Sequence, residues 1–172
     1  KYIEVLASKG IIKDAYKEQY NPGQKISRGE YLDMIIKALG LNVQVESNFD
    51  DVSSTDYFYN TIGIAKQLGI ARGTGNNAYE PYKELTREDA FIILERTLKA
   101  MVDVKDIDYE KALMKFTDEQ DISDYARYSV SRLVGNGIVQ GSSVKGELKM
   151  MPKENLSKAE AVTLVYRRIN IQ

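Results

Sequence analysis

The chain has 172 residues, of which 43% are hydrophobic and 28% are charged. This composition can support one compact domain or a few small units that share a core. The 24 basic and 25 acidic residues give a formal net charge of −1, which argues against a nucleic-acid-binding surface. Because cysteine and histidine are absent, disulfides, thiolate or imidazole metal ligands and a cysteine nucleophile are excluded. We therefore expect no cofactor and no bound metal.

No apolar run approaches the roughly 18 residues of a membrane span, so no transmembrane segment is predicted. The sequence begins inside a predicted helix and shows no signal peptide. We expect it to be a fragment of a longer protein.

In chain order, the predicted helices alternate between two kinds. Helices of the first kind end at a glycine followed by isoleucine, which is typical of a helix C-cap. These glycines are Gly10, Gly69 and Gly137, and the last two helices are predicted over 57–68 and 125–136. Helices of the second kind follow a Ser or Thr with an acid three residues later, as in a capping box. The predicted caps are Ser27 with Glu30, Thr86 with the shorter Asp89, and Ser157 with Glu160.

Each helix of the second kind carries one apolar stripe at helical spacing. The stripes are Leu32, Ile35 and Leu39; Phe91, Leu94 and Leu98; and Val162, Val165 and Ile169. One pair of helices cannot cover its own stripe, so copies of the unit are expected to pack on one another. The polar segments 42–47 and 103–110 are predicted to be linkers or short extra turns.

All three prolines occupy the same place in a recurring pattern. A bulky apolar residue lies two positions before each proline, an aliphatic residue four after it, and the capping Ser or Thr five after it, followed by a basic residue. The prolines are Pro22, Pro81 and Pro152, and the basic residues are Arg28, Arg87 and Lys158. The sequence therefore predicts three copies of one unit, over 1–46 (without its N-terminal part), 47–110 and 111–172.

The second copy carries an ordered series of residues: Phe49-Asp50-Asp51-Val52, Tyr57, Ile62, Leu68-Gly69-Ile70, Gly73, Tyr79-Glu80-Pro81 and Leu85-Thr86-Arg87-Glu88-Asp89. This series resembles an S-layer homology domain, although the family usually has Trp where Tyr57 stands. The third copy is similar through Phe116, Asp118, Tyr125, Gly137-Ile138, Gly141, Pro152 and Leu156-Ser157-Lys158-Ala159-Glu160. The first copy shows only the second half, from Ile3 to about Leu41.

The resemblance implies a mainly α fold of three helix-loop-helix repeats in a pseudo-threefold arrangement around a central helical bundle. It also implies a secreted cell-surface protein held non-covalently on the bacterial cell wall. The ligand would be an anionic secondary cell-wall polysaccharide, typically with pyruvylated amino sugars, bound in grooves between repeats; a peptidoglycan-linked glycan is a second possible partner. In such families the basic residue of the Thr-Arg-Ala-Glu-like tetrad contacts the ligand, which nominates Arg28, Arg87 and Lys158.

A physical argument supports a ligand-binding role for these three cations. A positive charge in the first turn of a helix opposes the helix dipole, so its threefold recurrence indicates a compensating use. Free N–H groups at the helix start together with a guanidinium would form a receptor for a carboxylate. Lysine offers only a point charge, so the Lys158 site is expected to be weaker. The alternative is that each cation pairs with the acid of its own capping turn.

Further ligand-binding candidates are Gly73, Gly141, Glu88 and Tyr79. The glycines would bring backbone close to a sugar or simply take positive φ in a turn; the first copy has Asp14 at this position, so its groove is expected to differ. Tyr57 and Tyr125, or Tyr20 and Tyr79, could stack on a pyranose ring, although the core is favoured for the first two. Tyr57 and Tyr125 are expected in the core, with hydroxyls that need partners.

The acids invite two other interpretations. A calcium site is conceivable at two acidic groups, Asp50, Asp51 and Asp56, or Asp118, Glu119, Asp121 and Asp124. Neither group has the glycine and terminal glutamate of an EF-hand loop. Solvated loop acids and helix caps are therefore favoured. Paired carboxylates could in principle hydrolyse a glycoside, but no acid of this sequence lies in a pattern that predicts a raised pKa. No enzyme is therefore expected. The main alternative to glycan binding is a helical protein–protein interaction module in a cell-surface assembly.

Overall fold

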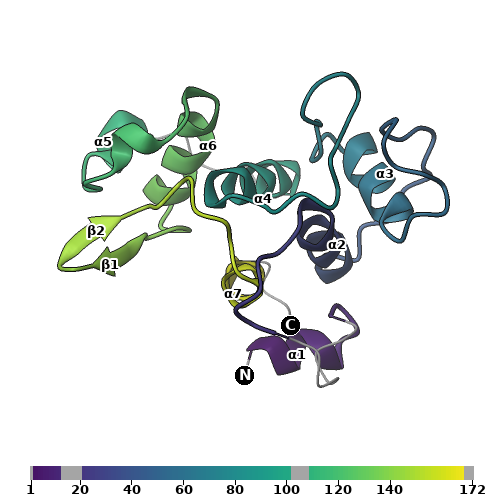
Figure 1. Cartoon of the computed structure of the whole chain (residues 1–172), viewed down its shortest axis with the longest axis horizontal. Coiled ribbons are helices and arrows are strands. Elements are labelled where there is room, and N and C mark those ends of the chain that lie inside the picture. The colour runs from purple at the N-terminus through teal and green to yellow at the C-terminus, as the bar shows by residue number, and fades with distance from the viewer. Residues whose placement is uncertain (1, 13–20, 102–108, 169–172) are drawn as a thin grey trace. The chain divides into compact units, whose positions relative to one another are not determined.

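The computed structural model describes residues 2–12, 21–101 and 109–168 (Figure 1). These ranges contain seven α-helices, one short 3₁₀ helix and one two-stranded antiparallel hairpin, which confirms the predicted mainly α fold. The elements are α1 (Tyr2–Ser8), α2 (Arg28–Ala38), α3 (Tyr59–Gln67), α4 (Arg87–Met101), α5 (Tyr109–Leu113), η1 (Glu119–Asp121), α6 (Asp124–Gly135), β1 (Ser142–Val144), β2 (Glu147–Lys149) and α7 (Lys158–Arg168). None of the helices in these ranges is long and apolar enough to cross a membrane.

The chain divides into two compact units. The first unit comprises Lys1–Leu85 and Leu156–Gln172, and the second comprises Thr86–Asn155. The first unit therefore holds α1, α2, α3 and α7, and the second holds α4, α5, α6 and the hairpin.

Helices of different sequence copies pack on each other. In the first unit α2 packs on α3, and α1 packs on α7; in the second unit α4 packs on α6. Each of these pairs joins a helix that begins after a capping Ser or Thr to a helix that ends at Gly-Ile, and the two helices come from different predicted copies. The packing of one copy against another, expected from the uncovered apolar stripes, is thus confirmed.

The helix starts follow the predicted capping residues. At α2 the Ser27 side chain accepts from the Glu30 N–H while the Glu30 side chain accepts from the Ser27 N–H. Ser157 and Glu160 form the same box at α7. At α4 the Asp89 N–H donates to Thr86 Oγ1 at 3.3 Å.

The helix ends follow the predicted glycines. Gly10, Gly69 and Gly137 have φ between 68° and 70°, a left-handed conformation that glycine adopts without strain. After each glycine, the isoleucine N–H donates to the carbonyl five residues earlier, as in a Schellman motif. A local signal in the sequence thus determines where these helices stop.

The cores contain the predicted stripes. Leu32, Ile35, Phe91, Leu94, Val162 and Val165 are buried. Leu39 and Leu98 are half-buried, and Ile169 lies outside the described residues. Residues 42–47 contain no helix or strand, in agreement with the predicted linker, and Val45 lies against Gly63 of α3. Most of 103–110 lies outside the described residues, and α5 begins at Tyr109.

Candidate functional site

The first three backbone N–H groups of α2 are engaged in hydrogen bonds. The Arg28 N–H donates to the Lys83 carbonyl at 2.9 Å, and the Gly29 N–H donates to the Pro81 carbonyl at 2.7 Å. The third N–H donates to the capping serine. The two carbonyls belong to the loop that follows the proline of the next sequence copy.

The same arrangement recurs at the starts of α4 and α7. The N–H of Arg87 donates to the Glu154 carbonyl at 2.9 Å, and the N–H of Lys158 donates to the Gln24 carbonyl at 2.8 Å. At both helices the next N–H donates to the carbonyl of the neighbouring proline, Pro152 or Pro22. The prediction that free N–H groups receive a carboxylate is therefore wrong, because acceptors distant in sequence already occupy them.

The two arginines are held by the same side-chain bond. Arg28 Nε donates to the Tyr79 carbonyl at 2.9 Å, and Arg87 Nε donates to the Met150 carbonyl at 3.0 Å. The accepting residue lies two positions before the proline in each case. Arg28 also lies over the Tyr79 ring, and Arg87 over the Phe91 ring. Only 8% of Arg28 and 7% of Arg87 is exposed, so each guanidinium has a fixed position in its unit.

Lys158 has a different environment. Its Nζ lies 3.0 Å from the Glu30 carboxylate, which is the capping acid of α2. The expected pairing with an acid therefore occurs, but with the acid of another copy and not with Glu160 of its own turn. The Lys158 ammonium group is therefore engaged by a carboxylate of its own unit.

Tyr79 is a packing residue. Its ring is fully buried and stacks on Phe49 with centroids 5.4 Å apart, and its hydroxyl donates to the Arg28 carbonyl at 3.4 Å. The prediction that this ring stacks on a pyranose is therefore wrong, because no face of it reaches solvent. Tyr20, another stacking candidate, and Asp14 lie outside the described residues.

The loops before Pro81 and Pro152 are each held by one aspartate. Asp51 accepts from the N–H groups of Tyr79 and Glu80 at 2.8 and 2.7 Å. Asp118 accepts from the N–H groups of Met150 and Met151 at 2.8 and 2.7 Å. Glu80 and Met151 both have positive φ, which few side chains adopt, and the bonds from the aspartates hold them there.

The remaining acids do not gather around a cation position. In the described ranges no group of three or more acidic, histidine or cysteine side chains could hold a metal ion. Asp51 and Asp118 instead bind loop backbone, which is a structural task that the sequence analysis did not assign to them.

Gly73 and Gly141 also have a packing role. Both have positive φ, and a Cβ added at Gly73 would lie 2.8 Å from Phe49 Cε1, while one at Gly141 would lie 2.5 Å from Phe116 Cε1. A carbonyl oxygen lies within 2.7 Å of each added Cβ as well. Glycine is therefore required here by the fold, and direct contact with a sugar stays a prediction.

Tyr57 and Tyr125 are not core residues. Tyr57 is 55% exposed and Tyr125 is 65% exposed, so the expectation that they are buried is wrong. The buried residue is in each case the next one, Phe58 or Ala126. The expected hydroxyl partners do exist: Lys37 Nζ donates to the Tyr57 hydroxyl at 3.0 Å, and the Tyr125 hydroxyl donates to Glu88 at 3.0 Å.

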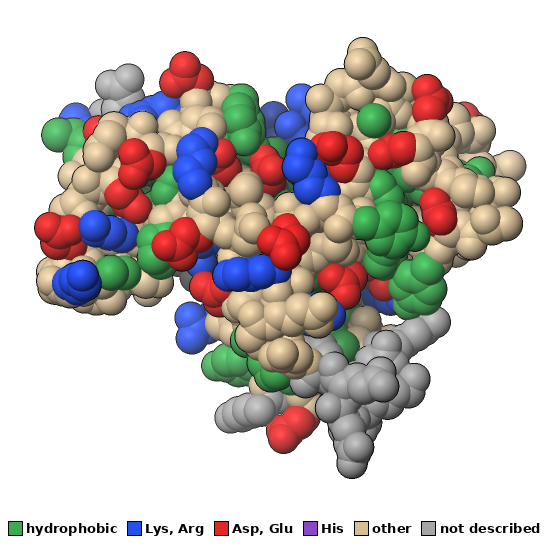
Figure 2. All heavy atoms as spheres, in the orientation of Figure 1, with side chains coloured by type: hydrophobic (Ala, Val, Ile, Leu, Met, Phe, Trp, Pro, Cys, Tyr) green, Lys and Arg blue, Asp and Glu red, His purple; other side chains and the backbone are tan. Residues whose placement is uncertain are grey.

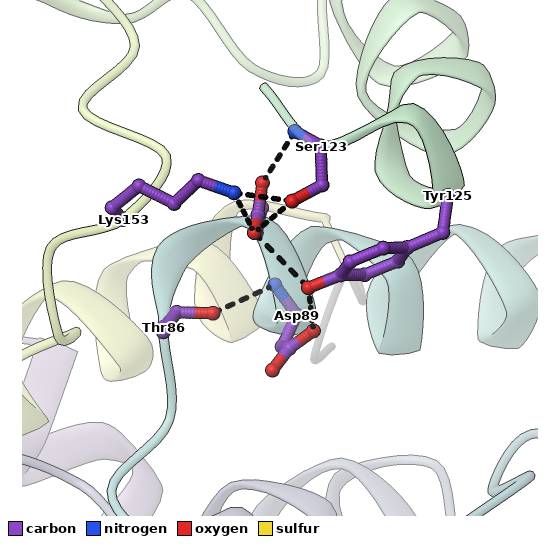
Figure 3. Close-up of polar contacts among 6 residues, drawn as sticks. Thr86, Asp89, Ser123, Tyr125 and Lys153 are labelled. Carbon is purple, nitrogen blue, oxygen red and sulfur yellow. Dashed lines mark hydrogen bonds and ion pairs between the residues drawn. The ribbon is translucent and has the colours of Figure 1, made fainter. Parts of the chain in front are cut away.

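In the second unit Ser123, Tyr125 and Lys153 converge on one carboxylate (Figure 3), which belongs to Glu88. Its carboxylate accepts from the Ser123 N–H at 3.0 Å, the Ser123 hydroxyl at 2.9 Å, the Tyr125 hydroxyl and Lys153 Nζ at 2.7 Å. Burial alone would raise the pKa of Glu88, but the bonds from Lys153 and Ser123 outweigh it and lower this pKa. Burial and the neighbouring Asp89 raise the pKa of Tyr125 to about 12. At neutral pH the cluster therefore contains an ionised Glu88 and a neutral Tyr125.

Lys153 and Ser123 were not among the predicted site residues. A comparison of the three copies could have identified Lys153, because the residue after the proline is Gly23, Tyr82 and Lys153 in turn. The position after the first-turn cation varies likewise, as Gly29, Glu88 and Ala159. Such differences within one chain indicate that the copies are not equivalent.

The family model for the S-layer homology domain matches three segments, residues 1–32, 48–91 and 115–162, which together make up more than half of the chain. The chain belongs to the S-layer homology domain family. Each matched segment falls within one predicted repeat and includes both the proline of that repeat and the four residues that begin with the capping Ser or Thr. This family consists of non-catalytic modules that attach proteins to the cell wall, and this S-layer homology chain is such a cell-surface anchoring module.

Relatives of two kinds share this region. The chain is 34% identical to an amylopullulanase of Thermoanaerobacterium thermosulfurigenes and 31% identical to the exoglucanase XynX of Acetivibrio thermocellus, over 95% of the chain in both cases. It is 26% identical, over 97% of its length, to the surface-layer 125 kDa protein of Lysinibacillus sphaericus. The chain spans only 8%, 15% and 14% of these three relatives, so the similarity concerns one region of much larger proteins.

Proposed function

We propose that this module anchors a secreted protein by binding an anionic secondary cell-wall polysaccharide that bears pyruvylated amino sugars. Arg28 and Arg87 contact the acidic substituent, and Lys158 provides a weaker third position. Gly73 and Gly141 shape the loop that holds each arginine and bring its backbone towards the sugar. Tyr79 contributes its carbonyl group to the position of Arg28.

The observation that carries this proposal is the identical Nε–H···O=C bond of Arg28 and Arg87. A guanidinium that is already fixed by one bond loses little conformational entropy when it grips a carboxylate. The loop backbone that fixes it is in turn held by Asp51 or Asp118. Two positions are thus built in the same way around a cation, which is what recognition of a repeating anionic polymer requires.

A sedimentation experiment tests the class of ligand. Purified cell-wall sacculi should bring down the chain, and acid extraction of the secondary polymer should abolish this binding. Binding to the extracted sacculi would instead favour a peptidoglycan-linked glycan or a protein partner and would refute the proposal.

A calorimetric experiment tests the chemistry. A methyl glycoside of an N-acetyl amino sugar with a pyruvyl ketal should bind, and the same glycoside without the ketal should bind at least tenfold more weakly. Arg28→Gln should weaken binding of the ketal glycoside. Lys9→Gln, which removes an exposed cation from the same unit, is the matched control.

A further inference from the structure

The two arginine sites differ at the residue that follows each arginine. In the first unit this residue is Gly29, where an added Cβ would lie 2.6 Å from Phe58 Cδ2 and 2.9 Å from the Pro81 carbonyl oxygen. No side chain fits there, because the Phe58 ring takes the space. In the second unit the residue is Glu88, and the residue equivalent to Phe58 is the small Ala126. The first unit thus has the Phe58 ring at this helix start, where the second unit has the Glu88 carboxylate.

A second exchange accompanies the first. The residue after the proline is Tyr82 in the first unit and Lys153 in the second. Tyr82 lies against Phe58, with ring centroids 5.9 Å apart, whereas Lys153 Nζ lies 2.7 Å from the Glu88 carboxylate. The two differences occur together. Tyr82 packs on the ring that covers Gly29, and Lys153 pairs with the carboxylate of Glu88.

The first unit consequently presents aromatic rings. Tyr82 is 64% exposed, and the exposed Tyr57 packs edge-on against Phe58 with centroids 5.1 Å apart. Lys37 Nζ lies over the Tyr57 ring, donates to the Tyr57 hydroxyl and is paired with the Asp33 carboxylate. Figure 2 shows hydrophobic side chains gathered over the region between α2 and α3. Rings beside cations suit a sugar that carries an acidic group.

The second unit presents an internal ion pair instead. Glu88 is 2% exposed, and its four hydrogen bonds engage Lys153, Ser123 and Tyr125. Figure 2 shows acidic and basic side chains interspersed over α4. The carboxylate belongs to the residue after Arg87 and neutralises Lys153, whose Nζ lies 2.7 Å away. The positive charge of Lys153 is therefore engaged by Glu88 and does not add to that of Arg87 at this helix start.

We infer that Glu88 determines the ligand preference of the second unit by neutralising Lys153 and thereby weakening the binding of an anionic sugar at Arg87. The first unit, with Gly29, Phe58 and Tyr82 at the start of α2, is then the principal binding site. The inference rests on the proposed function. Glu88 was expected to contact the ligand; in this inference it instead disfavours ligand binding.

The test is a gain of function measured by calorimetry with the ketal glycoside. Glu88→Gln keeps the size and an acceptor oxygen but removes the charge, and Glu88→Ala copies the residue found at this position in the third copy. Either variant should bind about one more equivalent of glycoside than the wild type. In an Arg28→Gln background either variant should raise the affinity at least tenfold. Adding Arg87→Gln should abolish this gain, which separates it from any binding at Lys158.

Asp124→Asn is the control for lost charge, because this exposed carboxylate lies in the same unit outside the Glu88 cluster. It should give no additional equivalent. Thermal melts establish that the variants are folded. If folded Glu88→Gln and Glu88→Ala both bind like the wild type, the inference is overturned while the proposed function stands. If the wild type binds neither the glycoside nor sacculi, both fail.

Discussion

Arg28 Nε donates a hydrogen bond to the Tyr79 carbonyl across 51 positions of sequence. The bond is buried and joins the start of a helix to the loop of the next copy. The arginine therefore stabilises the fold as well as carrying a charge for ligand. An Arg-to-Ala change at either helix start should therefore affect stability as well as binding.

We expect Arg28→Ala to lower the free energy of unfolding by about 1 to 3 kcal/mol, because a buried carbonyl loses a charged donor. Arg87→Ala should act similarly through the Met150 carbonyl. Urea denaturation of each variant measures the change. Lys9→Ala is the control, since substitution of an exposed side chain should stay within about 0.5 kcal/mol. Equal stability of all three variants would contradict a structural role of the arginines.

Asp118 and Asp51 allow a test of burial, since they make the same two backbone bonds in different surroundings. Asp118 is buried and Asp51 is exposed. Asp118→Ala should cost about 2 to 3 kcal/mol of unfolding free energy, because a buried and a part-buried N–H group lose a charged acceptor. Asp51→Ala should cost less, since water can replace the carboxylate. Urea midpoints of the two variants, compared with Asp121→Ala, decide this; a larger loss for Asp51→Ala would refute the argument.

The local part of the fold was predictable from sequence, and the partnerships between copies were not. Ser27 with Glu30 and the Gly-Ile pairs determine helix ends through contacts within a few residues. The error at Tyr57 arose because the buried face is set by Phe58, Ile62 and Ala65, at positions i, i+4 and i+7, one residue away from the tyrosine. Comparison of those three apolar residues with their equivalents in the third copy would have found the correct face.

The error about the helix starts has another cause. The carbonyls that occupy the N–H groups of α2 come from Pro81 and Lys83, more than 50 residues away. A local pattern shows that an N–H lacks an acceptor within its helix, but it cannot show an acceptor supplied by tertiary packing. The cluster around Glu88 was missed for the same reason, because Lys153 is 65 residues away.

Gly141 and Gly137 separate backbone strain from steric conflict. Both have φ near 70°, but an added Cβ meets Phe116 and the Lys149 carbonyl at Gly141 and meets no atom within 4 Å at Gly137. Gly137→Ala should cost about 1 to 2 kcal/mol from left-handed backbone alone. Gly141→Ala should cost about 1 to 3 kcal/mol more, because the Cβ displaces a packed ring and a carbonyl. Chemical denaturation measures both, and equal losses would show that the loop relaxes around the methyl group.

The lowered pKa of Glu88 predicts how the free energy of unfolding depends on pH. Its pKa is lowered in the folded state, chiefly because the bonds from Lys153 and Ser123 outweigh the effect of burial. The folded state thus holds this proton less tightly than the unfolded chain, and the resulting stability is fully present above about pH 4.5. It should be lost as the pH falls below 4.5 through the folded-state pKa. The unfolding free energy of Glu88→Gln should therefore decline less between pH 5 and 3 than that of the wild type; parallel pH profiles would refute this.

Glu95 and Arg132 form a buried ion pair between α4 and α6, with Nε and Oε1 3.2 Å apart. The equivalent positions in the first unit are the buried Ile36 and Ile64, eight residues after Arg28 and seven after Tyr57. Desolvation of two charges offsets much of their attraction, so a well-packed apolar pair can replace them. We expect Glu95→Ile to cost about 3 to 5 kcal/mol of unfolding free energy, because Arg132 stays buried without this carboxylate.

The double variant Glu95→Ile with Arg132→Ile should regain most of that loss or exceed wild-type stability, since it copies the apolar arrangement of the first unit. Urea denaturation of the wild type, both single variants and the double variant completes the cycle. Losses that simply add in the double variant would mean that the pair does not interact. A double variant as stable as the wild type would show that the two units reach the same packing with different chemistry.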